Sequence, residues 1–327
     1  MTNLLMSRLA TLGLLLRSIP LPGQDQPPIF RATSELVTLD VQVVHVKSAA
    51  PAPVLGASDF QVSEEGVRQT ILHFSRDESS LSILLLFDLT ESVRSMLKRL
   101  AEGAETALDH LKTADEVAVM VYSSDASLVA RFTTNRASTV AAIEKAVTMS
   151  SHGPAYFNEA VYQAAAQVGK RGKGGNRRVV IWLTDNLPNF PNRTQKYPPH
   201  TEEEALRALN ENGVVVAPIL LRSPAWEVLG PFVWAAEHSY EKSFPPGDAR
   251  KYAELTGGET VGLRGKHPGE RLAQLIDDLR ARYTISYRPS DPQPAGTFRK
   301  VRVTLAPSQT LRVKDWSLLA RQGYYRQ

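Results

Sequence analysis

The sequence contains no cysteine among its 327 residues. Disulfides, zinc fingers, thiol nucleophiles and iron–sulfur clusters are therefore excluded. The formal net charge of +4 is small and dispersed, which disfavours a nucleic-acid-binding protein. The densest basic run, between Lys170 and Arg178, lacks the Gly-Lys-Ser or Gly-Lys-Thr ending of a phosphate loop and is predicted to be a solvated loop.

Long hydrophobic runs are also missing, and no stretch is long enough to predict a transmembrane span. The short apolar run from Leu9 to Leu16 follows Arg8 and is followed by Pro20 and Pro22, a pattern typical of a signal peptide. We predict that residues 1–27 are a signal peptide and linker. The protein is then secreted, periplasmic or part of the cell envelope. A frayed amphipathic N-terminus is the alternative, and no Ala-x-Ala pattern marks a cleavage site.

What the chain does contain is a globular composition, with 43% hydrophobic and 22% charged residues. Its two ends have the pattern of β-strands. Apolar and polar residues alternate from Val37 to Val43, and strand-like stretches return after Tyr283. We predict an N-terminal β segment over residues 28–77 and a C-terminal β segment over 289–327. Neither is long enough to be stable alone, so we expect them to pack together as a small β-sandwich.

The middle of the chain, residues 78–288, has a different pattern. Nearly continuous apolar stretches predict strands buried on both faces, and they are Leu81–Phe87, Val117–Tyr122, Val179–Leu183 and Val214–Leu221. Apolar residues at helical spacing lie between them, a capping box at Thr201 and Glu204 begins one helix, and Pro268 begins the last. This alternation predicts an α/β domain with a doubly wound, mainly parallel, Rossmann-like sheet.

Two of these strands end in an acid, at Asp88 and at Asp185. Because ligands of open α/β sheets bind at the carboxyl ends of the strands, we expect the two acids to lie close together. Thr90 and Ser92 add two hydroxyls in the loop after Asp88. Oxygen ligands with few formal charges suit Mg²⁺ or Mn²⁺. An acidic side chain from a partner would then fill an open coordination position.

Each of these residues also has an ordinary structural interpretation. Asp88 is a common residue type at a helix N-cap, and Asp185 precedes Asn186 and Pro188 as a turn aspartate does. Taken singly, these interpretations are favoured. The set as a whole, aligned with two strand ends, favours the metal site. Glu91 and Glu159 lie near the same loops and are predicted to be solvated surface acids, and His152 is predicted to be incidental.

The motif Asp88-x-Thr90-x-Ser92 resembles the metal-ion-dependent adhesion site (MIDAS) of von Willebrand factor type A (VWA) domains, and Thr184-Asp185-Asn186 is similar to that family's later Thr-Asp-Gly. The resemblance covers about 80–287. The wider chain resembles the VWFA-related domain family described from acidobacteria, through Asp59-Phe60-x-Val62, Thr256-Gly257-Gly258, Tyr283-x-Ile285-x-Tyr287-x-Pro289 and Gly323-Tyr324-Tyr325. It implies a VWA-like fold and a role in adhesion or complex assembly.

One departure from the family pattern affects the metal site. The resemblance implies a threonine in the loop before the middle helix, where this chain has Ala155. An alanine methyl cannot coordinate a metal, so Ser150, Ser151, Asn158 or water would have to replace it. Losing one neutral oxygen weakens metal affinity without abolishing it, because both carboxylates remain.

Three functions follow from these observations. The first is a protein-binding module whose Mg²⁺ or Mn²⁺ bridges to an acidic residue of a partner protein, and the second is a metal-free interaction scaffold. The third is a metal-dependent hydrolase with Asp88 as nucleophile. Against the third, Asp88-x-Thr90 lacks a second aspartate, and no Gly-x-Ser-x-Gly or His-Glu-x-x-His is present. We therefore expect no enzyme and no catalytic residue.

The sequence also predicts two long loops. Pro188 to Pro199 directly follows the Asp185 loop, and Trp226 to Phe244 is rich in aromatic residues. Long loops beside a site are often functional. Our hypothesis is that these loops frame the partner-binding face, and a locally packed aromatic core is the alternative for the second.

Overall fold

The computed structural model describes residues 36–45, 54–76, 79–150, 155–172, 174–187, 200–221, 247–263, 268–291, 293–306 and 316–326. Residues Glu35–Gln327 form one compact unit. The predictions for residues 1–27, His152, 188–199 and 226–244 lie outside the described residues. No helix within the described ranges combines the length and the apolar character that crossing a membrane requires.

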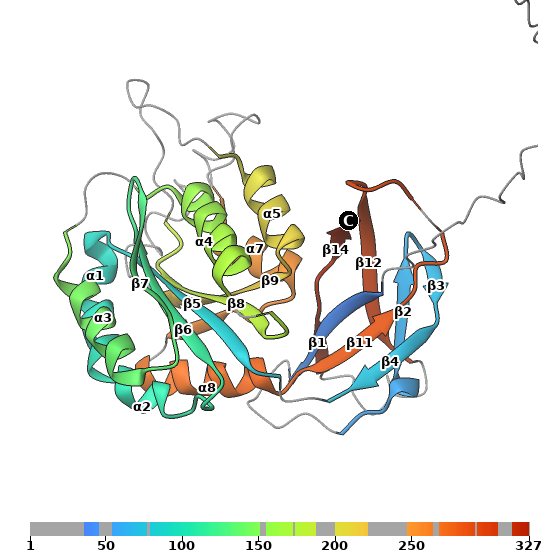
Figure 1. The fold of residues 1–327 in the computed structure, drawn as a ribbon, viewed down its shortest axis with the longest axis horizontal. Helices are drawn as coiled ribbons and strands as arrows, with labels where there is room; N and C mark the ends of the chain where they lie inside the picture. Colours follow the sequence, from blue (N-terminus) through green and yellow to red (C-terminus); the bar gives the residue numbers. More distant parts are fainter. Residues whose placement is uncertain are drawn as a thin grey trace, which may run out of the picture. The chain divides into compact units, whose positions relative to one another are not determined.

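A six-stranded sheet forms the centre of the α/β part (Figure 1), in the order β10-β9-β8-β5-β6-β7. Its strands are β5 (Leu81–Asp88), β6 (Glu116–Tyr122), β7 (Ala126–Thr133), β8 (Arg177–Thr184), β9 (Val214–Leu221) and β10 (Val261–Leu263). All neighbours pair in parallel except β6 and β7. Strand β5 is buried along its whole length, as the unbroken apolar sequence predicts for a strand covered on both faces.

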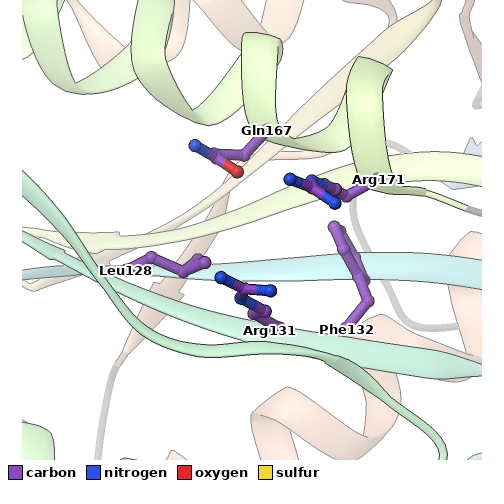
Figure 2. A pocket seen from close by; sticks show the side chains of 5 residues that line it. All are labelled: Leu128, Arg131, Phe132, Gln167 and Arg171. Carbon is purple, nitrogen blue, oxygen red and sulfur yellow. The ribbon is translucent and has the colours of Figure 1, made fainter.

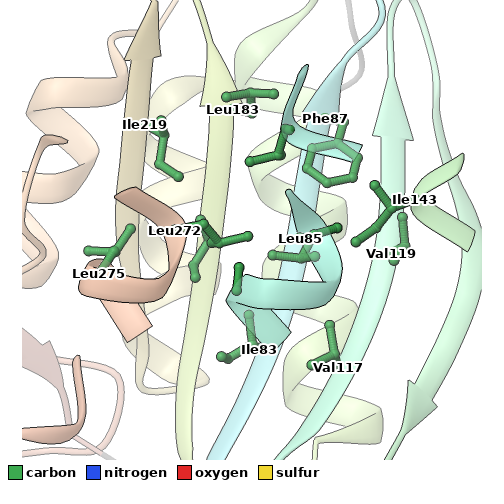
Figure 3. Close-up of a cluster of buried hydrophobic side chains, with 14 of the residues drawn as sticks. Ile83, Leu85, Phe87, Val117, Val119, Ile143, Leu183, Ile219, Leu272 and Leu275 are labelled. Carbon is green, nitrogen blue, oxygen red and sulfur yellow. The ribbon is translucent and has the colours of Figure 1, made fainter. Parts of the chain in front are cut away.

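Helices cover both faces of this sheet. One face packs against α1 (Glu91–Glu102), α2 (Ala104–Leu108), α3 (Arg136–Thr148) and α8 (Pro268–Arg280), with odd-numbered β5 residues such as Leu85 between them (Figure 3). The other face packs against α4 (Phe157–Arg171), α5 (Glu202–Glu211) and α7 (Ala249–Thr256), next to even-numbered residues such as Leu86. The period of two along the strand thus assigns each side chain to one of the two cores.

The ends of the chain form two further antiparallel sheets. One has the order β13-β1-β11-β4 and the other β14-β12-β2-β3. The strands are β1 (Val37–His45), β2 (Phe60–Glu64), β3 (Val67–Gln69), β4 (Ile71–Ser75), β11 (Tyr283–Tyr287), β12 (Phe298–Leu305), β13 (Trp316–Leu319) and β14 (Gly323–Tyr325), with a short 3-10 helix, η1 (Ala57–Asp59), before β2. Both sheets share one apolar core that includes Leu39, Phe60 and Tyr324. The predicted fold class, a mainly parallel α/β sheet flanked by a β unit from both termini, is confirmed.

Several element predictions differ from the structure. The apolar pattern from Met96 to Leu111 predicts one helix, but the structure has two, separated at Gly103. The stretch from Val67 to Phe74 predicts one strand, but β3 and β4 pair in different sheets. Strand β11 lies inside the predicted 78–288 domain yet pairs with β1 and β4. Strands β7 and β10 have no counterpart in the sequence prediction.

Polar contacts connect the α/β part with the terminal sheets. Arg177 at the start of β8 places a guanidinium nitrogen 3.0 Å from Asp40 of β1. Arg282, which has no exposed surface, donates to the Gly257 carbonyl at 3.0 Å and to Gln42 of β1 at 2.7 Å. Gln42 in turn donates to Glu259 at 2.8 Å. These contacts hold β1 against the start of β8 and against the segment that follows α7.

Candidate metal centre

The four predicted metal ligands come from two neighbouring strands. Asp88 is the last residue of β5, and Asp185 directly follows β8, which pairs with β5 in parallel. Both carboxylates therefore lie at the same end of the sheet, as predicted. Asp88 has no exposed surface and Asp185 is 4% exposed.

The Asp88 carboxylate accepts four hydrogen bonds. Its Oδ1 accepts the Thr90 backbone N–H at 2.8 Å and the Thr90 hydroxyl at 2.7 Å. Its Oδ2 accepts the Tyr122 phenol at 2.9 Å and the Thr184 hydroxyl at 3.2 Å. Trp182 donates its indole N–H to the Tyr122 oxygen at 2.9 Å, which orients that phenol. These donors fix the direction of both carboxylate oxygens.

A chain of short contacts connects the two acids through the hydroxyls. Thr90 Oγ1 lies 3.3 Å from Ser92 Oγ, and the Ser92 hydroxyl donates to Asp185 Oδ2 at 2.5 Å. Thr90 is the N-cap of α1, but its side chain makes no capping hydrogen bond. Capping of α1 therefore does not explain the hydroxyl at position 90. Successive side-chain contacts thus connect all four predicted residues.

Burial controls the charge of this site. Desolvation raises the pKa of Asp88 from 3.8 to about 6, the Thr90 hydrogen bonds oppose that rise, and the nearby charge of Asp185 adds to it. Two carboxylates held close together in a buried site favour a cation between them, since a positive charge stabilises both ionised forms. Among the described residues, the main influences on the Asp88 pKa include no basic side chain.

The loop that carries Asp185 is fixed by residue 186. Asn186 adopts a left-handed backbone with φ 59°, a conformation that asparagine tolerates better than most residues. Its side chain accepts the Ala249 backbone N–H at 2.8 Å and donates to Asp248 at 3.1 Å, so it contacts the start of α7. Asp185 Oδ1 accepts the Leu187 backbone N–H at 2.9 Å. Sequence reasoning did not find this role of Asn186, nor the role of Tyr122, because neither follows from local spacing.

The donor set fits a hard divalent cation. Thr90 and Ser92 donate their hydroxyl protons to carboxylates, which leaves the lone pairs of both oxygens free for an ion. Two ligands at right angles around Mg²⁺, each about 2.1 Å away, lie about 3 Å apart, close to the 3.3 Å between these hydroxyls. Among the described residues, no three His, Cys, Asp or Glu side chains gather as a metal-binding group. The candidate ligands among the described residues are thus two carboxylates and two hydroxyls.

The loop before α4 supplies no fifth oxygen from position 155. Ala155 is fully buried in the core beside α4, and the next residue, Tyr156, donates its N–H to the Ser123 carbonyl at 3.1 Å. Of the predicted substitutes, Asn158 has its side-chain oxygen occupied by the Tyr252 hydroxyl at 2.8 Å. Ser150 is exposed, and Ser151 lies outside the described residues.

The two acids predicted to be solvated behave differently. Glu91 is exposed and pairs with Arg94 at 2.8 Å, in agreement with the prediction. Glu159 is only 6% exposed, so its prediction is wrong. Its carboxylate pairs with His200 Nδ1 at 2.6 Å and accepts from Gln163 at 2.9 Å. His200 stacks on Tyr162, which covers this pair from one side.

Residues 83–187 match the family model of the von Willebrand factor type A domain. The match runs from β5 through the loop after β8 and includes all four candidate ligands. This segment of the chain is therefore a von Willebrand factor type A domain. No curated protein matches the chain.

Similar solved structures include three proteins of low identity. The conserved hypothetical protein BatB from Bacteroides thetaiotaomicron is 16% identical, with 61% of this chain and 98% of that chain covered and a TM-score of 0.42. A von Willebrand factor type A protein from Catenulispora acidiphila is 11% identical, with 90% and 75% covered and a TM-score of 0.42. Proximal thread matrix protein 1 from the mussel byssus, with a zinc-occupied MIDAS motif, is 17% identical, with 66% and 49% covered and a TM-score of 0.41.

Proposed function

We propose that this chain is an exported protein-binding module that holds Mg²⁺ or Mn²⁺ at Asp88, Thr90, Ser92 and Asp185. The ion keeps one coordination position open for an acidic residue of a partner protein. One observation carries the proposal: two hydroxyls donate their protons to two buried carboxylates and keep their lone pairs for an ion. When bound, the cation supplies a positive charge that attracts the partner's carboxylate.

Calorimetric titration with MgCl₂ and MnCl₂ tests the cation site. We expect a saturable heat for the wild type and none for Asp88→Ala. Glu91→Ala, which removes an exposed acid from the start of α1, is the matched control and is expected to bind as the wild type does. Ser92→Ala removes a single hydroxyl and serves as a second variant. Equal heats in all four proteins contradict the cation site.

Recovery of a partner from the cell envelope of the source organism tests the recognition step. We expect a partner to be retained on immobilised protein in Mg²⁺, to be released by a chelator and to be absent from immobilised Ser92→Ala. Retention that neither the chelator nor the variant changes contradicts a cation bridge.

A metal-free scaffold is the second candidate, and the buried methyl of Ala155 favours it. An oxygen at this position is one ligand that the family pattern includes and this chain lacks. Ala155→Ser is expected to raise Mg²⁺ affinity in the same titration if the missing oxygen limits binding. A wild type that gives no heat with either metal, together with a partner retained in chelator, supports the scaffold.

We propose no catalytic role. The groups that contact Asp88 are hydroxyls and one backbone N–H, which orient a carboxylate but offer no general base. A panel of phosphatase and esterase substrates tests this proposal. Clear turnover that Asp88→Ala abolishes would restore the metal-dependent hydrolase.

A further inference from the structure

A second polar site lies away from the cation site, in a cleft between β7 and the last turn of α4. Its lining residues are Leu128, Arg131, Phe132, Gln167 and Arg171 (Figure 2). The cleft has a volume of about 160 Å³, several times the space that one water molecule needs. Among the described residues, β7 is the last strand of its sheet, and no further described strand pairs with its outer side.

The two arginines come from different elements and extend into the same space. Arg131 lies on β7 and Arg171 is the last residue of α4, and Figure 2 shows both side chains reaching into the cleft. Within the part of the chain that the structure describes, neither guanidinium has a hydrogen bond or an ion pair with an acid. Two cations that share a cleft without a counter-charge repel each other, and an anion between them removes that repulsion.

The end of helix α4 accounts for the presence of only one of these two arginines. The end of α4 favours a positive side chain, because the last carbonyls of a helix carry partial negative charge. Arg171 is therefore expected there in any case. The partial charge at the helix end does not account for Arg131, since this residue lies on strand β7.

The remaining walls suit an anion with a polar and an apolar side. Leu128 and Phe132 pack against the buried cluster beside α4, so they form a fixed apolar wall. Gln167 adds an amide that can donate a hydrogen bond. Guanidinium groups bind phosphate and carboxylate oxygens in pairs, through two parallel N–H donors.

We propose that this cleft is an oxyanion-binding site that takes a phosphate or a carboxylate group between Arg131 and Arg171. Gln167 donates a third hydrogen bond, and Phe132 covers the less polar side of the ligand. The site does not depend on the cation centre. Because both arginines are exposed, affinity falls as ionic strength rises.

NMR of the arginine Nε–H groups in the full ¹⁵N-labelled chain at low salt tests the site, with Arg131→Gln and Arg171→Gln assigning the two signals. One arm adds sodium phosphate and the other N-acetylglutamate amide, a mimic of an acidic side chain. We expect saturable shifts of both signals in the wild type. The double Arg→Gln variant lacks both signals, so the side-chain amide of Gln167, which also lines the cleft, reports binding there, and we expect this binding to be at least about tenfold weaker. Arg68→Gln, an exposed strand residue with the same charge change, is expected to bind like the wild type.

Each outcome decides the proposal. A response to phosphate alone identifies a phosphate group as the ligand, and a response to the glutamate mimic alone identifies a partner's acidic side chain. Responses to both support a general oxyanion site. No saturable shift in either arm, or an equal weakening in the double variant and in Arg68→Gln, overturns the proposal.

Discussion

Asp88 shows how a single buried carboxylate can be held ready for an ion. Its four hydrogen bonds replace part of the hydration that it loses on burial. They do not replace all of it, because burial still raises its pKa to about 6. Without a cation, the ionised form is therefore a source of instability.

This imbalance predicts a pH-dependent effect of Asp88→Asn on the metal-free protein. The folded pKa of Asp88 lies above its ordinary value of 3.8. The stability that protonated Asp88 contributes is therefore complete below pH 3.8 and is lost as pH rises through about 6. At pH 7.5 this loss is about 3 kcal/mol in the wild type, and the asparagine variant avoids it.

Urea unfolding in chelator, at pH values between 4 and 7.5, measures the effect. We expect the free energy of unfolding of Asp88→Asn to rise relative to the wild type across this range. Glu91→Gln, at an exposed position, is expected to show no such trend. A difference between Asp88→Asn and the wild type that does not change with pH would contradict the burial argument.

Local sequence predicted part of the site and could not predict the rest. Asp88 and Asp185 were found because each ends an apolar stretch, and parallel strands bring such ends together. Tyr122 and Asn186 were missed because their partners are distant in sequence. Tyr122 contacts Asp88 across the sheet, and Asn186 contacts Asp248 at the start of another helix.

At the scale of elements, the helices α2 and α8 approach closely at a pair of glycines. A Cβ added to Gly269 would lie 2.5 Å from the Gly103 carbonyl oxygen, and a Cβ on Gly103 would lie 2.9 Å from the Gly269 Cα. These neighbours are backbone atoms, which cannot rotate away. The break between α1 and α2 at Gly103 thus lies where the two helical segments contact α8.

Gly269→Ala is therefore expected to destabilise the fold by about 1–3 kcal/mol, the usual cost of overpacking. Gly262→Ala is a matched control, because nothing lies within 4 Å of its added Cβ. Thermal unfolding of both variants measures the effect. Equal melting temperatures for the two would show that α8 can shift to relieve the contact.

Asp115 fixes the start of the central strand from the loop before β6. Its carboxylate accepts the Leu81 backbone N–H at 2.8 Å and the Lys112 backbone N–H at 2.7 Å, and it pairs with Arg280 of α8 at 2.6 Å. Asp115 has no exposed surface. It therefore connects three elements at the end of the sheet opposite the cation site.

Asp115→Ala leaves the Arg280 cation buried without its partner, which costs about 3–5 kcal/mol in such pairs. We expect a loss of stability of this size in urea unfolding. Asp109→Ala, which removes an exposed acid from the end of α2, is expected to change stability little. A small effect of Asp115→Ala would mean that water reaches Arg280.

The elements that the sequence predicts best are the strands with a long apolar run. Strands β5, β8 and β9 lie within a few residues of their predicted ranges, because each contains a nearly continuous apolar run. Strand β7 was missed because it is only half buried and contains Ser127 and Arg131. Strand β10 has three residues, too few to carry a period.

At the scale of the whole molecule, both ends of the chain build one core. Strand β1 pairs with β11 and β13, and β2 pairs with β12. Buried Glu64 of β2 accepts hydrogen bonds from Tyr287 at 2.6 Å, from Tyr324 at 3.1 Å and from Arg299 at 2.8 Å. Residues from the C-terminal part of the chain therefore donate all three of these hydrogen bonds to a buried carboxylate in the N-terminal part.

Arg282 is expected to couple the terminal sheets to the α/β part. Arg282→Ala leaves two acceptors, the Gly257 carbonyl and Gln42 Oε1, without this donor, at about 1–3 kcal/mol each. The wild type is expected to melt in a single transition. Calorimetry measures the number of melting transitions in the wild type and the loss of stability in Arg282→Ala. Arg68→Ala, which removes an exposed arginine, is the control. Two separate transitions in the wild type would show that the parts unfold independently.

The pairing of β1 with β13 also constrains the order in which the protein can assemble. Strand β1 precedes the central sheet in the chain and is synthesised before it, but β11 and β13 emerge only after the whole central sheet has been made. Contacts between such distant segments close large loops and form late. A ribosome-bound chain that has not reached Trp316 is thus left with one side of β1 unpaired, a ready template for aggregation, until β13 has been made.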